Sequence, residues 1–309
     1  MICGFAAHLR LEKLLLWEMQ ICARWLSLNG AGAGSRPALL SSAELRKGID
    51  HMHQDFHVID AVSAYDALAP YYKAISSARG AYLEAVERII IEHARGAKSL
   101  LDMGAGDAVR TCVIAEEASV PHVVAVEPSS VMRMQCRKKI ELWNCRAADI
   151  PETDLRFNVI LCLWNVLGHV STAKERLRTL RRARELLAPG GMIFVDVNNR
   201  YNAVAHGWGR ACWNMLHDYF LWAETNGDVV ISWTVGGRSV CTHGHLFTRR
   251  ELESLFQRAD LSIRREWFLN YRNGAICKSS LHGSLLYQLE ATQRGAISFA
   301  SGDMPSAPI

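Results

Sequence analysis

The chain has 309 residues, of which 50% are hydrophobic and 21% charged, a balance typical of a globular protein with a sizeable core. Its formal net charge of +4 argues against a protein built mainly to bind nucleic acid, because such proteins carry a strong basic field. Its 9 cysteines occur singly, with no Cys-x-x-Cys pair and no zinc-ligand spacing, which favours a reduced, cytoplasmic compartment.

The first fifty residues are expected to form a peripheral extension. Residues 9–28 are apolar, but charged side chains interrupt every window of membrane-spanning length, and no signal-peptide pattern follows. Residues 29–42 are rich in glycine and serine and predict a linker. We therefore expect no membrane partner, an extension over residues 1–50, one catalytic domain over 51–290 and a flexible tail over 291–309.

Two groups of histidines raise the question of a metal site. The first lies within residues 51–57, and no carboxylate or cysteine pattern completes a ligand set around it. The second is His243 and His245, which alternation along a strand turns to one face together with Cys241. No fourth ligand is evident there either. We therefore interpret both groups as structural or solvated and expect no metal.

A glycine turn within residues 99–111, SLLDMGAGDAVRT, organises the rest of the chain. A short apolar strand carries Asp102 and runs into Gly104, Ala105 and Gly106 before a helix begins. Glycine adopts backbone angles closed to other residues and lets the main chain approach a ligand closely. The first helical turn then presents unpaired N–H groups to that ligand. The pattern predicts a nucleotide-cofactor site.

The spacing of the turn discriminates between cofactors. A dinucleotide-binding turn carries a third glycine where this chain has Val109, whose branched side chain would crowd a pyrophosphate. The stretch instead resembles motif I of the class I S-adenosylmethionine-dependent methyltransferases, an acidic residue followed by Gly-x-Gly-x-Gly, with Ala108 replacing the last glycine. This resemblance implies S-adenosylmethionine as cofactor, with the glycine turn under its methionine part and Asp102 near its amino group.

The resemblance covers residues 62–290 and implies a fold. The expected architecture is α/β, a Rossmann-like, doubly wound, seven-stranded and mostly parallel sheet with an antiparallel last strand. An insertion over residues 199–246 is expected to cover the substrate, with an aromatic helical stretch over 201–223 and a β-hairpin around the glycine pair 236–237. The alternative for any one of these aromatic rings is simple packing against the core.

Two more acidic residues follow at strand ends. Glu127 ends a strand of branched residues about twenty residues past the turn, where nucleotide-binding folds place an acid against the ribose hydroxyls. Asp149 alone is a weak signal, since an Asp before a proline turn is commonplace. In the resembling family the acid at this position contacts the adenine amino group. The expected cofactor contacts in these two segments are Glu127, Pro128, Asp149 and Ile150, with Ala148 beside the ring.

The segment 157–170, FNVILCLWNVLGHV, is predicted to be a buried parallel strand followed by a loop at its carboxyl end, the edge where open α/β sheets bind ligands. We expect Leu163, Trp164 and Asn165 to reach the cofactor. His169 is the candidate general base, because imidazole titrates near neutral pH. The alternative is that it caps a helix or bonds the main chain, and a base is needed only when the acceptor arrives protonated.

The segment before the glycine turn and two capping patterns complete the picture. Residues 62–76 resemble the Tyr-Asp-x-x-Ala-x-x-Tyr lid of many small-molecule methyltransferases, which makes Tyr65, Tyr71 and Tyr72 candidates to line the site, with aromatic packing as the alternative. Ser129 or Ser130 is expected to begin a helix that reaches about Trp143, and Thr248 with Glu251 matches a capping box.

The predicted function is methyl transfer from S-adenosylmethionine to an O or N atom of a small molecule by in-line displacement. No nucleic-acid partner is expected, and the sequence says nothing of oligomeric state. Three alternatives stay open: a methyltransferase acting on RNA or protein, a non-catalytic scaffold that kept the fold, and a nucleotide-dependent oxidoreductase, which Val109 disfavours.

Overall fold

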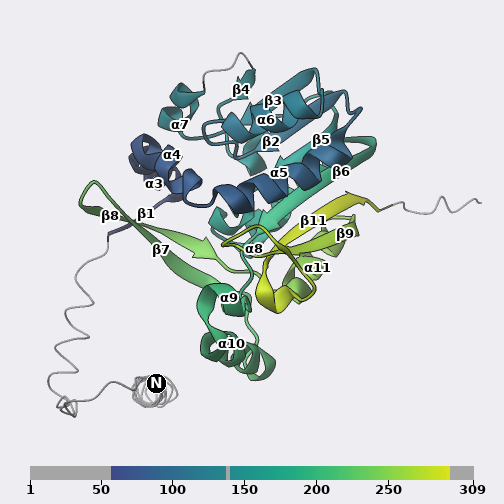
Figure 1. Ribbon diagram of the computed structural model, residues 1–309. Helices are drawn as coiled ribbons and strands as arrows, with labels where there is room; N and C mark the ends of the chain where they lie inside the picture. The colour runs from purple at the N-terminus through teal and green to yellow at the C-terminus, as the bar shows by residue number, and fades with distance from the viewer. Residues whose placement is uncertain (1–56, 137–139, 293–309) are drawn as a thin grey trace, which may run out of the picture. The chain divides into compact units, whose positions relative to one another are not determined.

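The computed structural model describes residues 57–136 and 140–292, which form a central sheet between two layers of helices (Figure 1). The sheet has 8 strands in the order β10-β9-β11-β6-β5-β2-β3-β4. Their bounds are β2 (Ser99–Met103), β3 (His122–Val126), β4 (Glu141–Trp143), β5 (Phe157–Cys162), β6 (Leu187–Val197), β9 (Leu261–Leu269), β10 (Ile276–Cys277) and β11 (Ser284–Ala291).

The strand directions confirm the predicted Rossmann-like class. Strands β4, β3, β2, β5 and β6 pair in parallel, whereas β11 pairs antiparallel with both β6 and β9. The last strand therefore lies inside the sheet, between β6 and β9, and not at its edge. The seven expected strands are all present, and the two-residue β10 adds an eighth beside β9.

Helices cover both faces because the strands are apolar on both sides. Leu100 of β2 packs in a cluster with α5 (Gly80–Ala94) and α6 (Val109–Glu117). Its neighbour Leu101 points the other way, into a cluster with α8 (Ala173–Leu186) and α11 (Arg249–Arg258). Such alternation of buried side chains is typical of a sheet that helices cover on both faces. The ribbon in Figure 1 shows helices on both sides of the sheet.

A second sheet of 3 strands is built from the insertion and from the start of the described chain. Its order is β1-β8-β7, with β1 (Val58–Ile59) parallel to β8 (Arg238–His245) and β7 (Asp228–Val235) antiparallel to it. Gly236 and Gly237 have φ angles of +55° and +75°, which a two-residue hairpin of the I′ type requires. The predicted hairpin is confirmed.

The helical part of the insertion and the helices before β2 complete the described residues. Two helices precede the hairpin, α9 (Ala203–His206) and α10 (Trp208–Phe220). On α10 the rings of Tyr219 and Phe220 are 80% and 73% exposed. Before β2 the chain forms α3 (Ala61–Leu68), the 3-10 turn η1 (Ala69–Tyr71) and α4 (Tyr72–Ser77).

The capping predictions are confirmed at their starts, but one helix is shorter than expected. Ser129 caps α7 (Ser130–Gln135) through a hydrogen bond from Met132 N, and Thr248 with Glu251 forms a complete capping box on α11. The expectation that the helix reaches Trp143 was wrong. Trp143 belongs to β4, because pairing with Val126 of β3 extends the sheet there and overrides helical propensity.

The predictions made for residues 1–56 and 293–309 lie outside the described residues. These include the extension, the linker, the tail and the histidines at positions 51 and 53. Within the ranges that the structure does describe, no helix is long and apolar enough to span a membrane.

Candidate functional site

The glycine turn lies at the carboxyl ends of β2 and β3. Gly104 N and Ala105 N both donate to Val126 O, at 2.8 and 3.0 Å, which holds the turn against β3. Gly104 and Gly106 have φ angles of +84° and +60°, and a Cβ added to Gly104 would come within 2.7 Å of the Val166 side chain. Only glycine fits there, since both the backbone angle and the space exclude a side chain.

Glu127 joins this turn to the next strand end. Its carboxylate accepts hydrogen bonds from Gly106 N at 2.9 Å and from Ser129 N at 2.8 Å. Burial raises the pKa of Glu127, an effect that these two bonds oppose. The carboxylate is thus fixed in place and lines a cavity at the strand ends.

Asp102 lies behind the turn. It is buried and accepts a hydrogen bond from Thr111 Oγ1 at 2.6 Å. Burial raises the pKa of Asp102 to about 6, although the bond from Thr111 works in the opposite direction. A nearby cationic group would lower that pKa again, because it favours the charged carboxylate.

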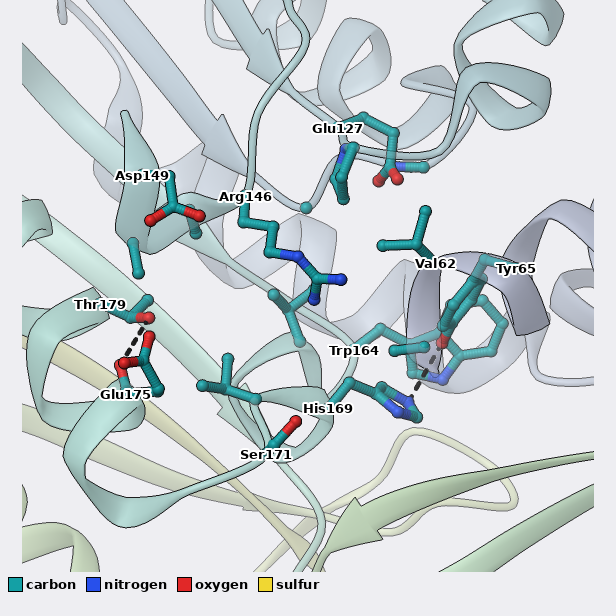
Figure 2. A pocket seen from close by; sticks show the side chains of 18 of the residues that line it. Val62, Tyr65, Glu127, Arg146, Asp149, Trp164, His169, Ser171, Glu175 and Thr179 are labelled. Carbon is teal, nitrogen blue, oxygen red and sulfur yellow. Dashed lines mark hydrogen bonds between the residues drawn. The ribbon is translucent and has the colours of Figure 1, made fainter. Parts of the chain in front are cut away.

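A cavity, which we call the strand-end cavity, opens over the turn and is shown in Figure 2. The predicted site residues that line it are Tyr65, Gly104, Gly106, Glu127, Pro128, Asp149, Leu163, Trp164 and His169. Tyr72 and Ala148, also named from sequence, line it too. Five predicted residues do not: Asp102, Ala105, Ile150, Asn165 and Tyr71. Tyr71 is 41% exposed and lies against Gly236 of the hairpin.

Several lining residues were missed by sequence reasoning. Arg146 comes from the segment before Asp149 and forms an ion pair with Asp60 at 3.5 Å, which links this wall to the residues before α3. Arg146 lies three residues before Asp149, so the prediction that Asp149 lines the site could have been extended to Arg146. Glu175 and Thr179 lie one turn apart on α8 and also line the cavity, but nothing in the sequence marks that face of α8.

Asp149 is placed in the cavity wall and is also engaged elsewhere. It ends the 3-10 turn η2 (Ala147–Asp149), and its Oδ1 accepts from Arg178 of α8 at 2.6 Å. Both side chains are about half exposed, so this ion pair contributes little stability by itself. It does orient the carboxylate at the edge of the cavity.

Tyr65 of α3 and His169 meet across the cavity, as the dashed line in Figure 2 marks. Tyr65 Oη lies 3.2 Å from His169 Nε2, and His169 Nδ1 lies 3.4 Å from His243 O. A carbonyl oxygen only accepts, so we assign the proton of the neutral ring to Nδ1 and the lone pair to Nε2. Burial lowers the pKa of His169, which favours this neutral form.

Trp164 and Asn165 form a strained turn after β5. Both have left-handed backbone angles, with φ of 52° and 63°. Asp196 of β6 holds the turn, since its Oδ2 accepts from Trp164 N at 3.0 Å and its main-chain oxygen accepts from Asn165 N at 2.9 Å. Tyr82 donates to the other oxygen of the same carboxylate. These hydrogen bonds hold the turn in its left-handed conformation and so fix the directions in which the Trp164 and Asn165 side chains leave the backbone.

A second cavity, which we call the aromatic cavity, adjoins the first and has a volume of about 350 Å³. It shares four lining residues with the strand-end cavity: Tyr65, Tyr72, Trp164 and His169. Asn165 lines this aromatic cavity, which places it beside the strand-end cavity and not within it. The Tyr65–His169 pair thus lies where the two cavities meet.

The histidines of the hairpin have different environments. His245 is fully buried, with Nδ1 2.6 Å from Asp228 Oδ1 and Nε2 2.8 Å from Glu251 Oε1, so it ties β7 and β8 to α11. His243 is exposed and contributes its main-chain oxygen to His169. Within the described ranges no group of three or more His, Cys, Asp or Glu side chains is arranged to hold a metal ion.

Comparison with known proteins identifies the family. The model of a family described as "Methyltransferase domain" matches residues 75–266, which is more than half of the chain. The chain belongs to this methyltransferase family. A search of curated proteins finds no match by sequence. The predicted resemblance is therefore confirmed by the family model.

Solved methyltransferase structures share the fold. An S-adenosylmethionine-dependent methyltransferase from Clostridium acetobutylicum superposes with a TM-score of 0.53 at 12% identity, covering 74% of this chain and 99% of that one. DesVI from Streptomyces venezuelae gives 0.51 at 17% identity, covering 72% and 97%. The CcbJ methyltransferase from Streptomyces caelestis gives 0.51 at 16% identity, covering 68% and 90%. At these identities the likeness shows that the chain has the same fold as these methyltransferases.

Proposed function

We propose that this methyltransferase binds S-adenosylmethionine in the strand-end cavity and transfers its methyl group to an O or N atom of a small molecule. The observation that carries the proposal is the junction of the two cavities. One holds the glycine turn and the Glu127 carboxylate, the other is walled by aromatic rings, and Tyr65 and His169 stand between them. A donor and an acceptor would meet at that point.

The residues of the strand-end cavity fit the proposed cofactor. The turn at Gly104 and Gly106 leaves room for its methionine part, and the cationic amino group suits the carboxylate of Asp102 behind the turn. Glu127 is positioned to accept from the ribose hydroxyls, as acids at this place do in nucleotide-binding folds. Ala148 and Asp149 are assigned to the adenine, and Leu163 with Trp164 to the wall beside it.

The bound cofactor would supply a methyl carbon on a sulfonium. The acceptor atom would bond to that carbon in line with the carbon–sulfur bond, which would break as S-adenosylhomocysteine leaves. The protein then has two tasks. The first is to align the acceptor and exclude water, and such positioning contributes on the order of 7 kcal/mol or more in well-oriented systems. The second is to take a proton when the acceptor arrives protonated, and His169 Nε2 is the acceptor for that proton, either directly or through the Tyr65 hydroxyl bonded to it.

A small acceptor is favoured over a macromolecule because α3 and the insertion both lie over the junction of the two cavities. Helix α3 supplies Tyr65, and the aromatic cavity is lined by Trp233 of β7 from the insertion. The ring centroids of Tyr65 and Trp233 lie 6.3 Å apart, so these two elements close over the junction. The modest net charge of the chain points the same way.

Calorimetric titration with S-adenosylmethionine tests the proposal. We expect micromolar binding that weakens at least about 10-fold, or about 1.4 kcal/mol, in Glu127→Ala. The matched control is Glu117→Ala, an exposed glutamate at the end of α6, which should bind as the wild type does. Absence of binding by the wild-type protein would favour the non-catalytic scaffold, and equal losses in both variants would remove Glu127 from the site.

A further inference from the structure

We propose that the aromatic cavity is the acceptor site and that its acceptor is a planar aromatic anion, with its negative group held at Arg79. This inference rests on the proposed methyl transfer, because it names the class of molecule that meets the donor at Tyr65 and His169.

Five aromatic rings from separate elements surround the cavity: Tyr65, Tyr72, Trp164, Trp233 and Tyr271. The centroids of Tyr72 and Trp164 lie 5.6 Å apart, and Trp164 Nε1 donates to Tyr271 Oη at 3.2 Å, so the rings hold one another in place. Ring faces and edges fixed in this way favour a flat, polarisable ligand that can stack or make edge contacts. The volume of about 350 Å³ falls in the range of small-molecule pockets, about 300–1,000 Å³.

The charge of the lining favours an anionic acceptor over a cationic one. Arg79 is the single ionic side chain around the aromatic cavity in the part of the chain that the structure describes, since His169 is neutral and no Asp or Glu lines it. A protonated amine placed there would lack a carboxylate partner and would be repelled by the guanidinium. An anion would find both a charge and a forked hydrogen-bond donor.

Arg79 also occupies a position that favours an anionic partner. It precedes the first residue of α5, where the helix dipole is positive and a cation costs stability. Its guanidinium carbon lies 4.5 Å from the centroid of Tyr271, which keeps the group at the cavity rim. Arg79 is exposed, and no carboxylate among residues 57–136 and 140–292 forms an ion pair with it, so an anionic ligand can reach the guanidinium beside the Tyr271 ring.

Calorimetry with matched ligands tests this class. Three naphthalene derivatives differ in charge, namely 2-naphthoate, 2-naphthamide and 2-naphthylmethylamine, and cyclohexanecarboxylate serves as an anion without a flat ring. Each is titrated into the full chain saturated with S-adenosylhomocysteine. That ligand occupies the strand-end cavity and leaves the aromatic cavity free. We expect 2-naphthoate to bind more tightly than any of the other three, by about 10-fold or more over the amine, because it alone is both flat and anionic.

Two variants locate the interaction. Arg79→Met should weaken 2-naphthoate about 10-fold and leave 2-naphthamide nearly unchanged, whereas Arg95→Met, at the other end of α5, should change neither. Trp233→Leu should weaken both ligands, since it removes a wall that the acid and the amide share. Retained binding of S-adenosylhomocysteine shows that each variant is folded.

The outcomes separate this inference from the proposed function. Tighter binding of the amine, equal losses in Arg79→Met and Arg95→Met, or no binding of any of the four ligands would overturn the acceptor class. If S-adenosylmethionine still binds in those cases, the methyl-transfer proposal stands without it. If S-adenosylmethionine does not bind, the ligands are titrated into the full chain alone. Binding of 2-naphthoate through Arg79 then makes the aromatic cavity a site for aromatic anions, and the transfer proposal fails.

Discussion

At the scale of single residues, the pair Tyr65 and His169 determines how turnover should depend on pH. With Nδ1–H directed to His243 O, the neutral imidazole keeps its lone pair on Nε2, 3.2 Å from the Tyr65 hydroxyl. Burial lowers the pKa of His169 below its usual value of 6.5, so the base is active above that lowered pKa and is lost as the pH falls through it. We expect kcat/KM to fall on the acid side, at a pH below 6.5, and to be level near neutrality.

Variants of the pair test this expectation. His169→Asn should lower kcat by about 100-fold and remove the acid limb, while affinity for S-adenosylmethionine stays nearly the same. Tyr65→Phe should keep the acid limb because the imidazole remains. The folded fraction must be followed at each pH, since a histidine with a lowered pKa also costs stability as the pH falls through its titration range. Turnover unchanged in His169→Asn would leave the histidine as a structural hydrogen-bond partner.

Some residues of the two cavities are marked by a sequence pattern and others are not. Glu127 and the glycine turn were predictable because each follows a strand, and parallel strands end at one edge of a sheet. Asp102 was predicted from the same motif to lie near the amino group of the cofactor. It lies behind the turn, where it accepts from Thr111 Oγ1 and does not line the strand-end cavity, and its contact with the cofactor stays a prediction. Arg79 and Tyr271 carry no local pattern. They reach the aromatic cavity only through the packing of α5 and the chain after β9.

At the scale of elements, α3 covers the junction of the cavities and is tied to α7. The Asp66 carboxylate accepts from Ser129 Oγ at 2.5 Å and from Val131 N at 3.4 Å, both at the start of α7. Gln135 at the other end of α7 donates to Ala69 O at 2.6 Å. Ala61, Val62 and Tyr65 of α3 line the strand-end cavity, so we expect the hold of α7 on α3 to affect how fast a ligand leaves it.

Removing the hydrogen bonds between α3 and α7 should make α3 less firmly held over the cavities. Asp66→Ala removes the carboxylate that both α7 donors use, and a hydrogen bond to a charged group is worth about 1.5–3 kcal/mol. We expect S-adenosylhomocysteine to dissociate about 10-fold faster, with a smaller change in its association rate. Stopped-flow displacement measures both rates. The control is Asp154→Ala, an exposed aspartate before β5, which should leave them unchanged; equal rates in wild type and Asp66→Ala would show that α3 does not retain the ligand.

Of the two parts of the insertion, the hairpin was predicted correctly, but the expected place of the aromatic helix in the site was not found. The hairpin was predictable from its glycine pair and alternating residues, and it supplies Trp233 to the aromatic cavity. The aromatic stretch before it was expected to offer walls for the substrate, but no ring of α10 lines either cavity, and Trp208 is 56% exposed. Composition marked only the helical stretch as aromatic. The pairing of β1 with β8, which brings the hairpin against α3, is a long-range contact that composition does not contain.

At the scale of the whole molecule, the fold and the site are predictable to different depths. The mostly parallel sheet and its antiparallel last strand were predicted from the family resemblance, whereas the order of the strands required the structure. The strand-end cavity is built from consecutive strand ends, and most of the residues that the sequence predicted as cofactor contacts line it. The aromatic cavity draws on residues from positions 65 to 271, which come together only in the folded chain, so its lining required the structure.

Native-state binding of the cofactor product gives the last prediction. A ligand that binds only the folded protein stabilises it, by about 2.7 kcal/mol at about 100 times its Kd. For a domain of this size, that corresponds to an increase in Tm of roughly 5–10 °C. We expect S-adenosylhomocysteine to produce this increase and NADH to produce none, because Val109 stands where a pyrophosphate-binding turn needs glycine. Thermal unfolding followed by fluorescence measures both, and stabilisation by NADH alone would restore the oxidoreductase alternative.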